Sequence, residues 1–148
     1  MDGLIIEKLN TSQVSEFQIL ITLFNNMFES PVLKVASEEF CESTLKDDRF
    51  IVISAKKSKE IIGGITAHIL PSYYHGTLEI FIYDLAVSKK HQRMGVGRAL
   101  MNALFAEAAE RKIKILFVDA ELEDQEALLF YEAIGGEKLA TSQFTFQL

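Results

Sequence analysis

The residues with the clearest chemical potential lie in the segment DLAVSKKHQRMGVGRAL, residues 84–100. Gly95 and Gly97, whose missing Cβ atoms let an anion come close, precede an apolar pattern typical of a helix. The first turn of a helix offers unpaired backbone N–H groups and a positive dipole end, which suit a phosphate. Four basic side chains accompany the glycines: Lys89, Lys90, Arg93 and Arg98. A polyphosphate ligand would explain this positive segment in a chain of net charge −6.

Other interpretations of the glycine loop stay open. Short glycine patterns recur by chance, so the glycines could simply turn the chain while water solvates the basic side chains. A Walker loop is excluded, because this sequence has no Gly-Lys followed by Ser or Thr. A dinucleotide fingerprint fits poorly, since its third glycine falls on Leu100 and seven residues separate Val87 from Gly95. Asp119 still lies at about the right distance to imitate the ribose-binding acid of that fingerprint.

A second group of candidates is acidic and follows an apolar run that predicts a strand. Five acids fall within eight residues: Asp119, Glu121, Glu123, Asp124 and Glu126. Most of them suit a solvated loop and an acidic helix start. For a substrate with several ammonium groups, however, a rim of Asp119, Glu121, Glu123 and Asp124 would attract and hold the substrate.

The length, composition and charge of the chain limit these possibilities. Its 148 residues, 49% hydrophobic and 24% charged, predict a single domain, residues 1–148. The net charge of −6 argues against general nucleic-acid binding and tolerates a cationic small molecule. We expect no membrane partner, because no apolar run approaches the roughly 20 residues of a membrane span, and no signal peptide is recognisable. The single cysteine, Cys41, excludes an internal disulfide and favours a cytoplasmic location. Without ligand spacing among Cys41 and the three histidines, we expect no metal site.

Apolar patterns predict the elements that would position these residues. Strands are expected at residues 4–9, on both sides of a KSK turn within 49–70, and at 77–87, 114–120 and 137–148. Helices are expected at residues 10–28, 37–47, 96–111 and 124–134. The order β-α-α-β-β-β-α-β-α-β indicates the α+β class, with a mixed, mostly antiparallel central sheet flanked by helices.

Two motifs carry a resemblance to a known family. Gln92-Arg93-Met94-Gly95-Val96-Gly97 resembles the Q/R-x-x-G-x-G/A signature of the GCN5-related N-acetyltransferases (GNAT), in which the loop amides bind the pyrophosphate of acetyl-coenzyme A. DQEALLFYEAIG, residues 124–135, resembles that family's late helix, N-x-x-A-x-x-F-Y-x-x-x-G. The predicted order of elements agrees with the GNAT fold. Within the family, IYDLAV, FVDAE and ALLFY look like the aminoglycoside 3-N-acetyltransferases.

The resemblance implies acetyl transfer from acetyl-CoA to a primary amine by direct attack, with a cationic amine as acceptor and a homodimer as the assembly. It implies that the backbone of residues 85–87 pairs with the pantetheine arm as an added strand, and that one N–H polarises the thioester carbonyl. The cofactor-binding residues implied in this way are Leu85, Ala86, Val87, Gln92, Arg93, Met94, Gly95, Val96, Gly97, Arg98 and Ala99.

Asp84 and Tyr131 are the catalytic candidates. Asp84 could take a proton from the ammonium, anchor a cationic substrate, or simply bond a neighbouring amide. Tyr131 matches the family's usual proton donor to the departing thiolate, although its place in the stripe Ala127, Phe130, Tyr131 and Ile134 alone predicts a core position. Asp124 replaces the family's common asparagine and is left free for substrate.

Two rivals to an aminoglycoside acetyltransferase follow from the sequence. One is an acetyltransferase that acts on a protein N-terminus, a lysine or a small metabolite. The other is a non-catalytic acyl-CoA-binding sensor, which the presence of Asp84 and Tyr131 disfavours.

Overall fold

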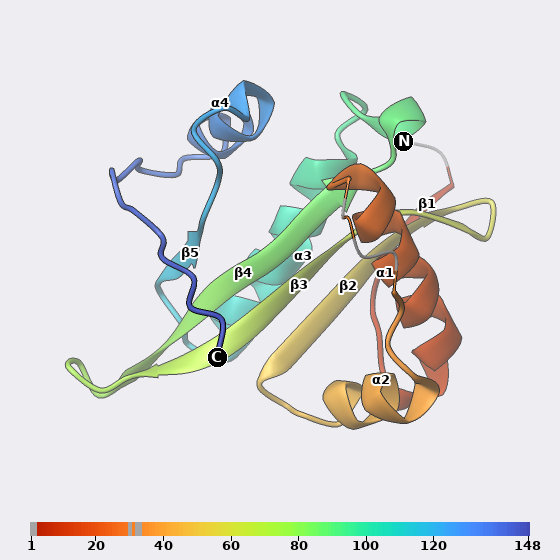
Figure 1. Ribbon diagram of the computed structural model, residues 1–148, viewed down its shortest axis with the longest axis horizontal. Helices are drawn as coiled ribbons and strands as arrows, with labels where there is room; N and C mark the ends of the chain where they lie inside the picture. The colour runs from red at the N-terminus through yellow and green to blue at the C-terminus, as the bar shows by residue number, and fades with distance from the viewer. Residues whose placement is uncertain (1–2, 30, 32–33) are drawn as a thin grey trace.

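A computed structural model describes residues 3–29, 31 and 34–148. Its strands are β1 (Leu4–Lys8), β2 (Phe50–Lys57), β3 (Glu60–Ser72), β4 (Thr77–Val87) and β5 (Leu116–Val118). Its helices are α1 (Val14–Met27), α2 (Glu38–Leu45), α3 (Val96–Glu110) and α4 (Gln125–Ala133), with short 3₁₀ turns η1 (Thr11–Gln13) and η2 (Lys89–His91). Up to α4, the order of elements is the predicted one (Figure 1).

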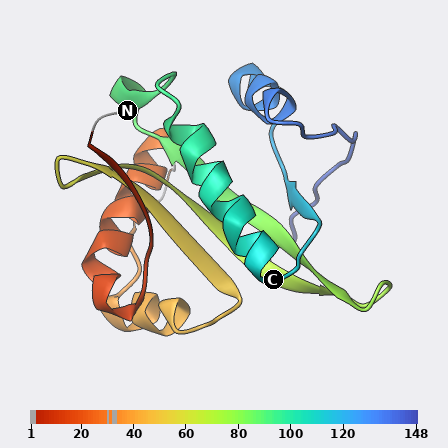
Figure 2. The same ribbon diagram turned by 180° about the vertical axis from the view of Figure 1, so that it is seen from behind.

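Within the described residues, the strands form one sheet in the order β1-β2-β3-β4-β5. The first four strands pair antiparallel with their neighbours, and β5 joins β4 in parallel after the α3 crossover. Helices α1 and α2 cover one face of the sheet and α3 covers the other (Figures 1 and 2). This arrangement confirms the predicted α+β class with a mixed, mostly antiparallel sheet.

The side chains of β2 show how the sheet divides the core into two layers. Successive strand residues point to opposite faces. Ile51 and Ile53 accordingly pack in the layer under α3, with Leu100 and Leu104. Val52 packs in the layer under α1 and α2. Both faces of the central strands are therefore covered by helices.

The predicted closing strand at residues 137–148 is wrong in this structure. Every residue from 134 to 148 is described, and none of them is in a strand. Phe144, Phe146 and Leu148 alternate as a strand would, yet their exposed fractions are 78%, 84% and 121%. Alternation shows which face a segment could bury but does not supply a partner. The edge strand β5 spans only 3 residues, so it offers at most a short ladder to a further strand.

No helix among the described residues is long and apolar enough to cross a membrane. The same residues contain no group of three or more His, Cys, Asp or Glu side chains arranged to hold a metal ion.

Candidate active site

A β-bulge decides where Asp84 points. Across β3 and β4, Thr66 pairs with Asp84 whereas Ala67 pairs with Ile82, so Tyr83 is an extra residue in β4. Regular alternation would put Asp84 on the face of Ile82, which is buried in the layer under α3. The bulge instead moves Asp84 to the face that α1 and α2 cover.

The carboxyl group of Asp84 is partly buried on that face. The Thr66 hydroxyl donates a hydrogen bond to Oδ2 of Asp84 at 3.3 Å. Burial raises the pKa of Asp84 above its ordinary value, against the opposing effects of the Thr66 hydrogen bond and of the charge that His68 can carry. A carboxylate with a raised pKa is a stronger base, which suits proton transfer from an ammonium group.

Asp84 lines a cavity of about 640 Å³ between the sheet and helices α1 and α2. The volume lies in the range of small-molecule sites. Aromatic side chains dominate the walls, among them Phe17, Phe50 and Tyr83. Among the described residues, Asp84 is the one carboxylate in the lining. Cys41 also lines the cavity, and burial raises the pKa of its thiol, which keeps the thiol protonated and makes it a poor nucleophile.

Tyr131 lies on α4, close enough to Asp84 to feel its charge. Burial, followed by the charges of Asp124 and Asp84, raises the pKa of Tyr131 to about 12. Its hydroxyl therefore stays protonated at neutral pH. Two other members of the predicted stripe, Phe130 and Ile134, pack against the core under α3, and Tyr131 does not belong to that cluster. This placement suits a proton donor better than a core residue.

The glycine loop ends at the N-terminus of α3. Gly95 has a φ of 82°, a left-handed conformation that favours glycine, and no side chain caps the helix. Arg93 also has a positive φ, 60°. The side-chain amide of Gln92 donates to the Val87 carbonyl at 3.0 Å and ties the loop to the end of β4. The first-turn N–H groups of α3, Val96 among them, are thus positioned for an anion.

The basic residues of the loop have different surroundings. Lys90 pairs with Glu60 at 2.9 Å. Arg98 donates to the Ala133 carbonyl at 3.4 Å, near the end of α4. In the part of the chain that the structure describes, Lys89 and Arg93 are exposed and form no ion pair, so neither charge is neutralised by a neighbouring side chain.

Glycine at position 97 suits helix packing as well as anion binding. A Cβ on Gly97 would lie 3.3 Å from the ring of Phe130. The absence of a side chain therefore lets α3 and α4 approach one another, in addition to exposing amides.

At its far end, β4 has one edge that pairs with no other strand of the described residues. β5 pairs with β4 only at Ile80, Phe81 and Ile82. Beyond the bulge, Leu85–Val87 pair with β3 on one side only, and the chain from β5 into α4 diverges from β4 (Figure 1). An extended ligand with amide groups could add to this edge as a strand does.

Comparison with known proteins decides the family. Residues 17–135 match the model of the acetyltransferase (GNAT) family. The chain belongs to the GNAT family. The predicted recognition is thereby confirmed at the level of the superfamily, and the chain is an N-acetyltransferase by descent.

Two similar proteins, one of them in two crystal structures, extend this GNAT assignment. An aminoglycoside acetyltransferase from an uncultured soil metagenomic sample, crystallised with trehalose, is 31% identical, with a TM-score of 0.95 over 99% of this chain and 97% of its own. A structure of the same enzyme with sisomicin gives 30% identity and a TM-score of 0.94, with the same coverage. The ribosomal protein bS18-alanine N-acetyltransferase of Escherichia coli K12 is 32% identical over 57 residues, which is 38% of each chain.

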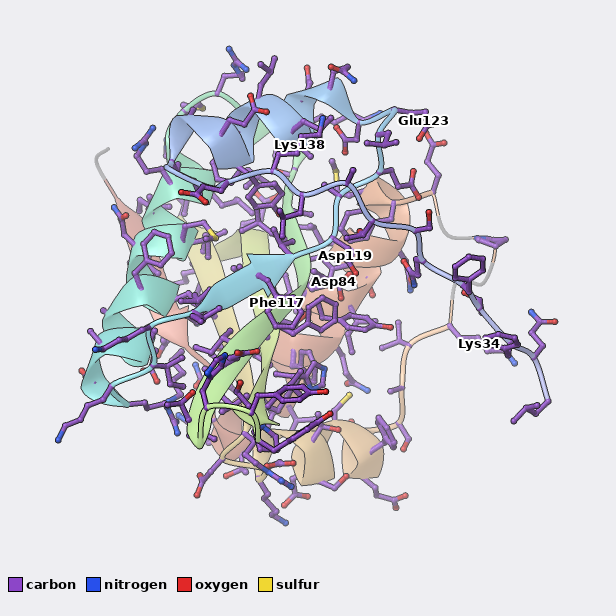
Figure 3. The ribbon with its side chains drawn as sticks, turned by 90° about the vertical axis from the view of Figure 1, so that its left-hand side faces the viewer. Lys34, Asp84, Phe117, Asp119, Glu123 and Lys138 are labelled. Carbon is purple, nitrogen blue, oxygen red and sulfur yellow. The ribbon has the colours of Figure 1, made fainter. Side chains whose placement is uncertain are left out.

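The acidic residues of this GNAT protein lie apart from the lining of the Asp84 cavity. Asp119, at the end of β5, and Glu123, on the loop before α4, are exposed (Figure 3). Glu121 is exposed on the same loop. Asp124 caps α4, and its Oδ1 accepts a hydrogen bond from the Ala127 amide at 2.9 Å. None of them lines the cavity, so their predicted contact with substrate stays a prediction.

Sequence reasoning missed the aromatic walls of the cavity. Phe50, His68 and Tyr83 come from three different strands and read as ordinary strand residues. The sequence offers one partial signal: Phe81 and Tyr83 are two residues apart in β4 and would share a face in a regular strand. The same regular alternation, however, would place Asp84 on the opposite face.

Proposed function

We propose that this GNAT N-acetyltransferase transfers the acetyl group of acetyl-CoA to a primary amine of an aminoglycoside. The observation that carries the proposal is Asp84, a partly buried carboxylate with a raised pKa, in a cavity beside the unpaired edge of β4. The similarity to an aminoglycoside acetyltransferase crystallised with sisomicin supports the acceptor class. The sequence motifs around Asp84 favour the 3-amino group.

The residues present fit acetyl-CoA. The uncapped start of α3, with Lys89 and Arg93 nearby, suits the pyrophosphate. The free edge of Leu85–Val87 suits the amide groups of the pantetheine arm. When bound, acetyl-CoA supplies an acetyl group activated as a thioester.

The chain's own residues would then perform three tasks. Asp84 takes a proton from the ammonium, which frees the nitrogen lone pair for attack. A backbone N–H within Leu85–Val87 donates to the thioester oxygen as its negative charge develops. Tyr131, protonated at neutral pH, gives its proton to the thiolate as the carbon–sulfur bond breaks. The second proton that the nitrogen loses as it becomes an amide restores the Tyr131 hydroxyl, so that one proton in all is released, through Asp84.

The test is thiol release from acetyl-CoA by the purified protein with sisomicin, spermidine or a short peptide as acceptor. An enzyme-only blank corrects for Cys41, the one cysteine of the chain. Release with sisomicin, with a mass gain of one acetyl group on it, is the expected result, and NMR of the product identifies the acetylated amine. Binding of acetyl-CoA without release in the presence of any amine would contradict the proposal and favour a sensor.

A separate observation supports a second class of acceptor, the N-terminus of a peptide. The similarity to the bS18-alanine N-acetyltransferase supports a peptide N-terminus as the acceptor. Release with an alanine-initiated peptide and not with sisomicin would establish that alternative. The homodimer and the cytoplasmic location belong to the proposal, and light scattering of the purified protein tests the first.

A further inference from the structure

A continuous row of aromatic rings crosses the sheet face that carries Asp84. Between neighbouring ring centroids, the distances are 6.0 Å for Phe17–Phe50, 4.7 Å for Phe50–His68 and 5.7 Å for His68–Tyr83. The row continues from Tyr83 to Phe81 at 5.9 Å and from Phe81 to Phe117 at 5.2 Å. We call these residues the aromatic row: Phe17, Phe50, His68, Tyr83, Phe81 and Phe117.

Core packing accounts for Phe17, which is buried, and in part for Phe50, but not for the rest of the row. Tyr83 is 65% exposed and Phe117 is 41% exposed, and Phe50, His68 and Phe81 are partly exposed. Side chains that only filled a core would be covered. An exposed apolar surface that is continuous with a cavity is typical of a ligand site.

The row and Asp84 share one space. Phe17, Phe50, His68 and Tyr83 line the cavity together with Asp84. Phe117, at the other end of the row, projects from β5 on the side of the sheet where Asp84 lies (Figure 3). The bulge at Tyr83 produces this combination, because it turns Asp84 onto the aromatic face.

The lining indicates which part of an amine is recognised. Within the described lining, Asp84 is the one carboxylate, and it can pair with one ammonium group. A second or third ammonium group of a ligand would find no opposite charge on these walls, so additional positive charge alone would not strengthen binding there. The flat faces of the rings can cover a saturated ring, whose C–H face loses contact with water when it stacks on them. The exposed acids of the loop before α4 add long-range attraction but line no part of the cavity.

We propose that the aromatic row is the acceptor-binding surface and that it takes a saturated six-membered ring bearing a primary ammonium, an amino sugar or aminocyclitol. The C–H face of the ring lies on Tyr83, with His68, whose ring plane is 75° from that of Tyr83, beside it, and the ammonium lies at Asp84. The inference rests on the proposed function and adds what the site selects: the ring, and not the total charge.

The experiment compares a cyclic with a linear acceptor in matched variants. Tyr83→Leu keeps an apolar side chain but removes the flat ring, and Tyr83→Phe restores it. Tyr74→Leu is the control, since Tyr74 is 83% exposed in the β3–β4 hairpin, where its ring contacts that of Tyr73. Phe117→Leu removes a ring at the other end of the row. Thermal melting of each variant checks that it folds.

Tyr83→Leu should raise the KM for sisomicin about tenfold, the loss expected for one stacked ring. The KM for spermidine should rise clearly less, and the KM for acetyl-CoA should not change. Tyr83→Phe and Tyr74→Leu should keep the wild-type KM for sisomicin, and Phe117→Leu should raise it. Equal effects on sisomicin and spermidine, or an unchanged KM for sisomicin in both Tyr83→Leu and Phe117→Leu, would overturn the inference while the proposed function stands.

Failure of the proposed function is distinguished by calorimetry. If no amine is acetylated, sisomicin is titrated into the protein with coenzyme A present. Binding that is lost in Tyr83→Leu and kept in Tyr83→Phe and Tyr74→Leu would support the aromatic row as a binding surface alone. No binding of sisomicin to the unmodified protein would overturn both proposals.

Discussion

Thr66 and Asp84 face each other across β3 and β4, and the Thr66 hydroxyl lies 3.3 Å from Oδ2 of Asp84. The pair exists because one extra residue, Tyr83, shifts the register of β4. The bulge thus turns a strand residue that would be buried under α3 into a carboxylate that lines a cavity.

Asp84→Asn should lower turnover by about 10²–10⁴-fold, the usual contribution of a general base. The amide keeps the size of the side chain and can still bond to Thr66, but it cannot accept a proton from an ammonium. Steady-state kinetics with sisomicin measure the loss, and calorimetry should show unchanged binding of acetyl-CoA. Turnover equal to that of the unmodified protein would remove Asp84 from the reaction.

Asp84→Asn should make the folded protein more stable, although it makes the protein less active. Burial raises the folded-state pKa of Asp84, so the folded protein holds the proton more tightly than the unfolded chain. The stability that this group contributes is present below its unfolded pKa, roughly 3.9, and is lost as pH rises through the raised folded value. At neutral pH the charged carboxylate therefore destabilises the fold, and Asp84→Asn should melt at a higher temperature than the unmodified protein.

The pH dependence of that difference is the check. The gain in melting temperature should shrink as the pH falls through the raised pKa, because the carboxyl of the unmodified protein then becomes neutral. A gain that is constant across this range would contradict the assigned pKa shift. A variant that is both less active and more stable would show that the charged carboxylate lowers the stability of the fold, although the reaction requires it.

Tyr131→Phe should slow acetyl transfer and leave acetyl-CoA binding intact, because it removes only the hydroxyl that protonates the thiolate. Since the pKa of Tyr131 is about 12, the kcat of the unmodified protein should show no decline assignable to this group up to about pH 10. Tyr73→Phe, at a 79% exposed position in the hairpin, is the matched control. Full activity of Tyr131→Phe would assign the proton transfer to another group.

Gly95→Ala tests the phosphate loop. Its φ of 82° makes alanine strained, at a cost of about 1–2 kcal/mol in the free energy of unfolding. Gly76 is a matched control, because it has a φ of 62° in the hairpin with no atom within 4 Å of an added Cβ. Both variants should lose similar stability in chemical denaturation, but only Gly95→Ala should weaken acetyl-CoA binding. Equal acetyl-CoA affinity in the two variants would separate the loop from cofactor binding.

Local patterns were sufficient to predict most elements, since the buried residues of α1 and α3 recur with the helical period that the sequence shows. They could not predict the side of the sheet that Asp84 faces, because a one-residue bulge inverts alternation and leaves no periodic signal. Residues 144–148 show the converse, with good alternation but no partner strand in the structure. The aromatic row could not be predicted from the sequence for a third reason. Its rings come from α1, β2, β3, β4 and β5, and only the fold brings them together.

Asp124 offers a direct way to separate a structural role from a substrate-binding role. Its Oδ1 accepts a hydrogen bond from the Ala127 amide at 2.9 Å and caps α4, the helix that carries Tyr131. Asp124→Ala should lower the free energy of unfolding by about 1 kcal/mol, and Asp124→Asn, which keeps the cap, should lower it by much less. If Asp124 acts only as a cap, the KM for sisomicin should be the same in Asp124→Asn as in the unmodified protein. A raised KM in Asp124→Asn, with stability intact, would instead place this carboxylate in contact with the acceptor. It would then support the prediction from the sequence that the acidic residues near α4 bind the substrate.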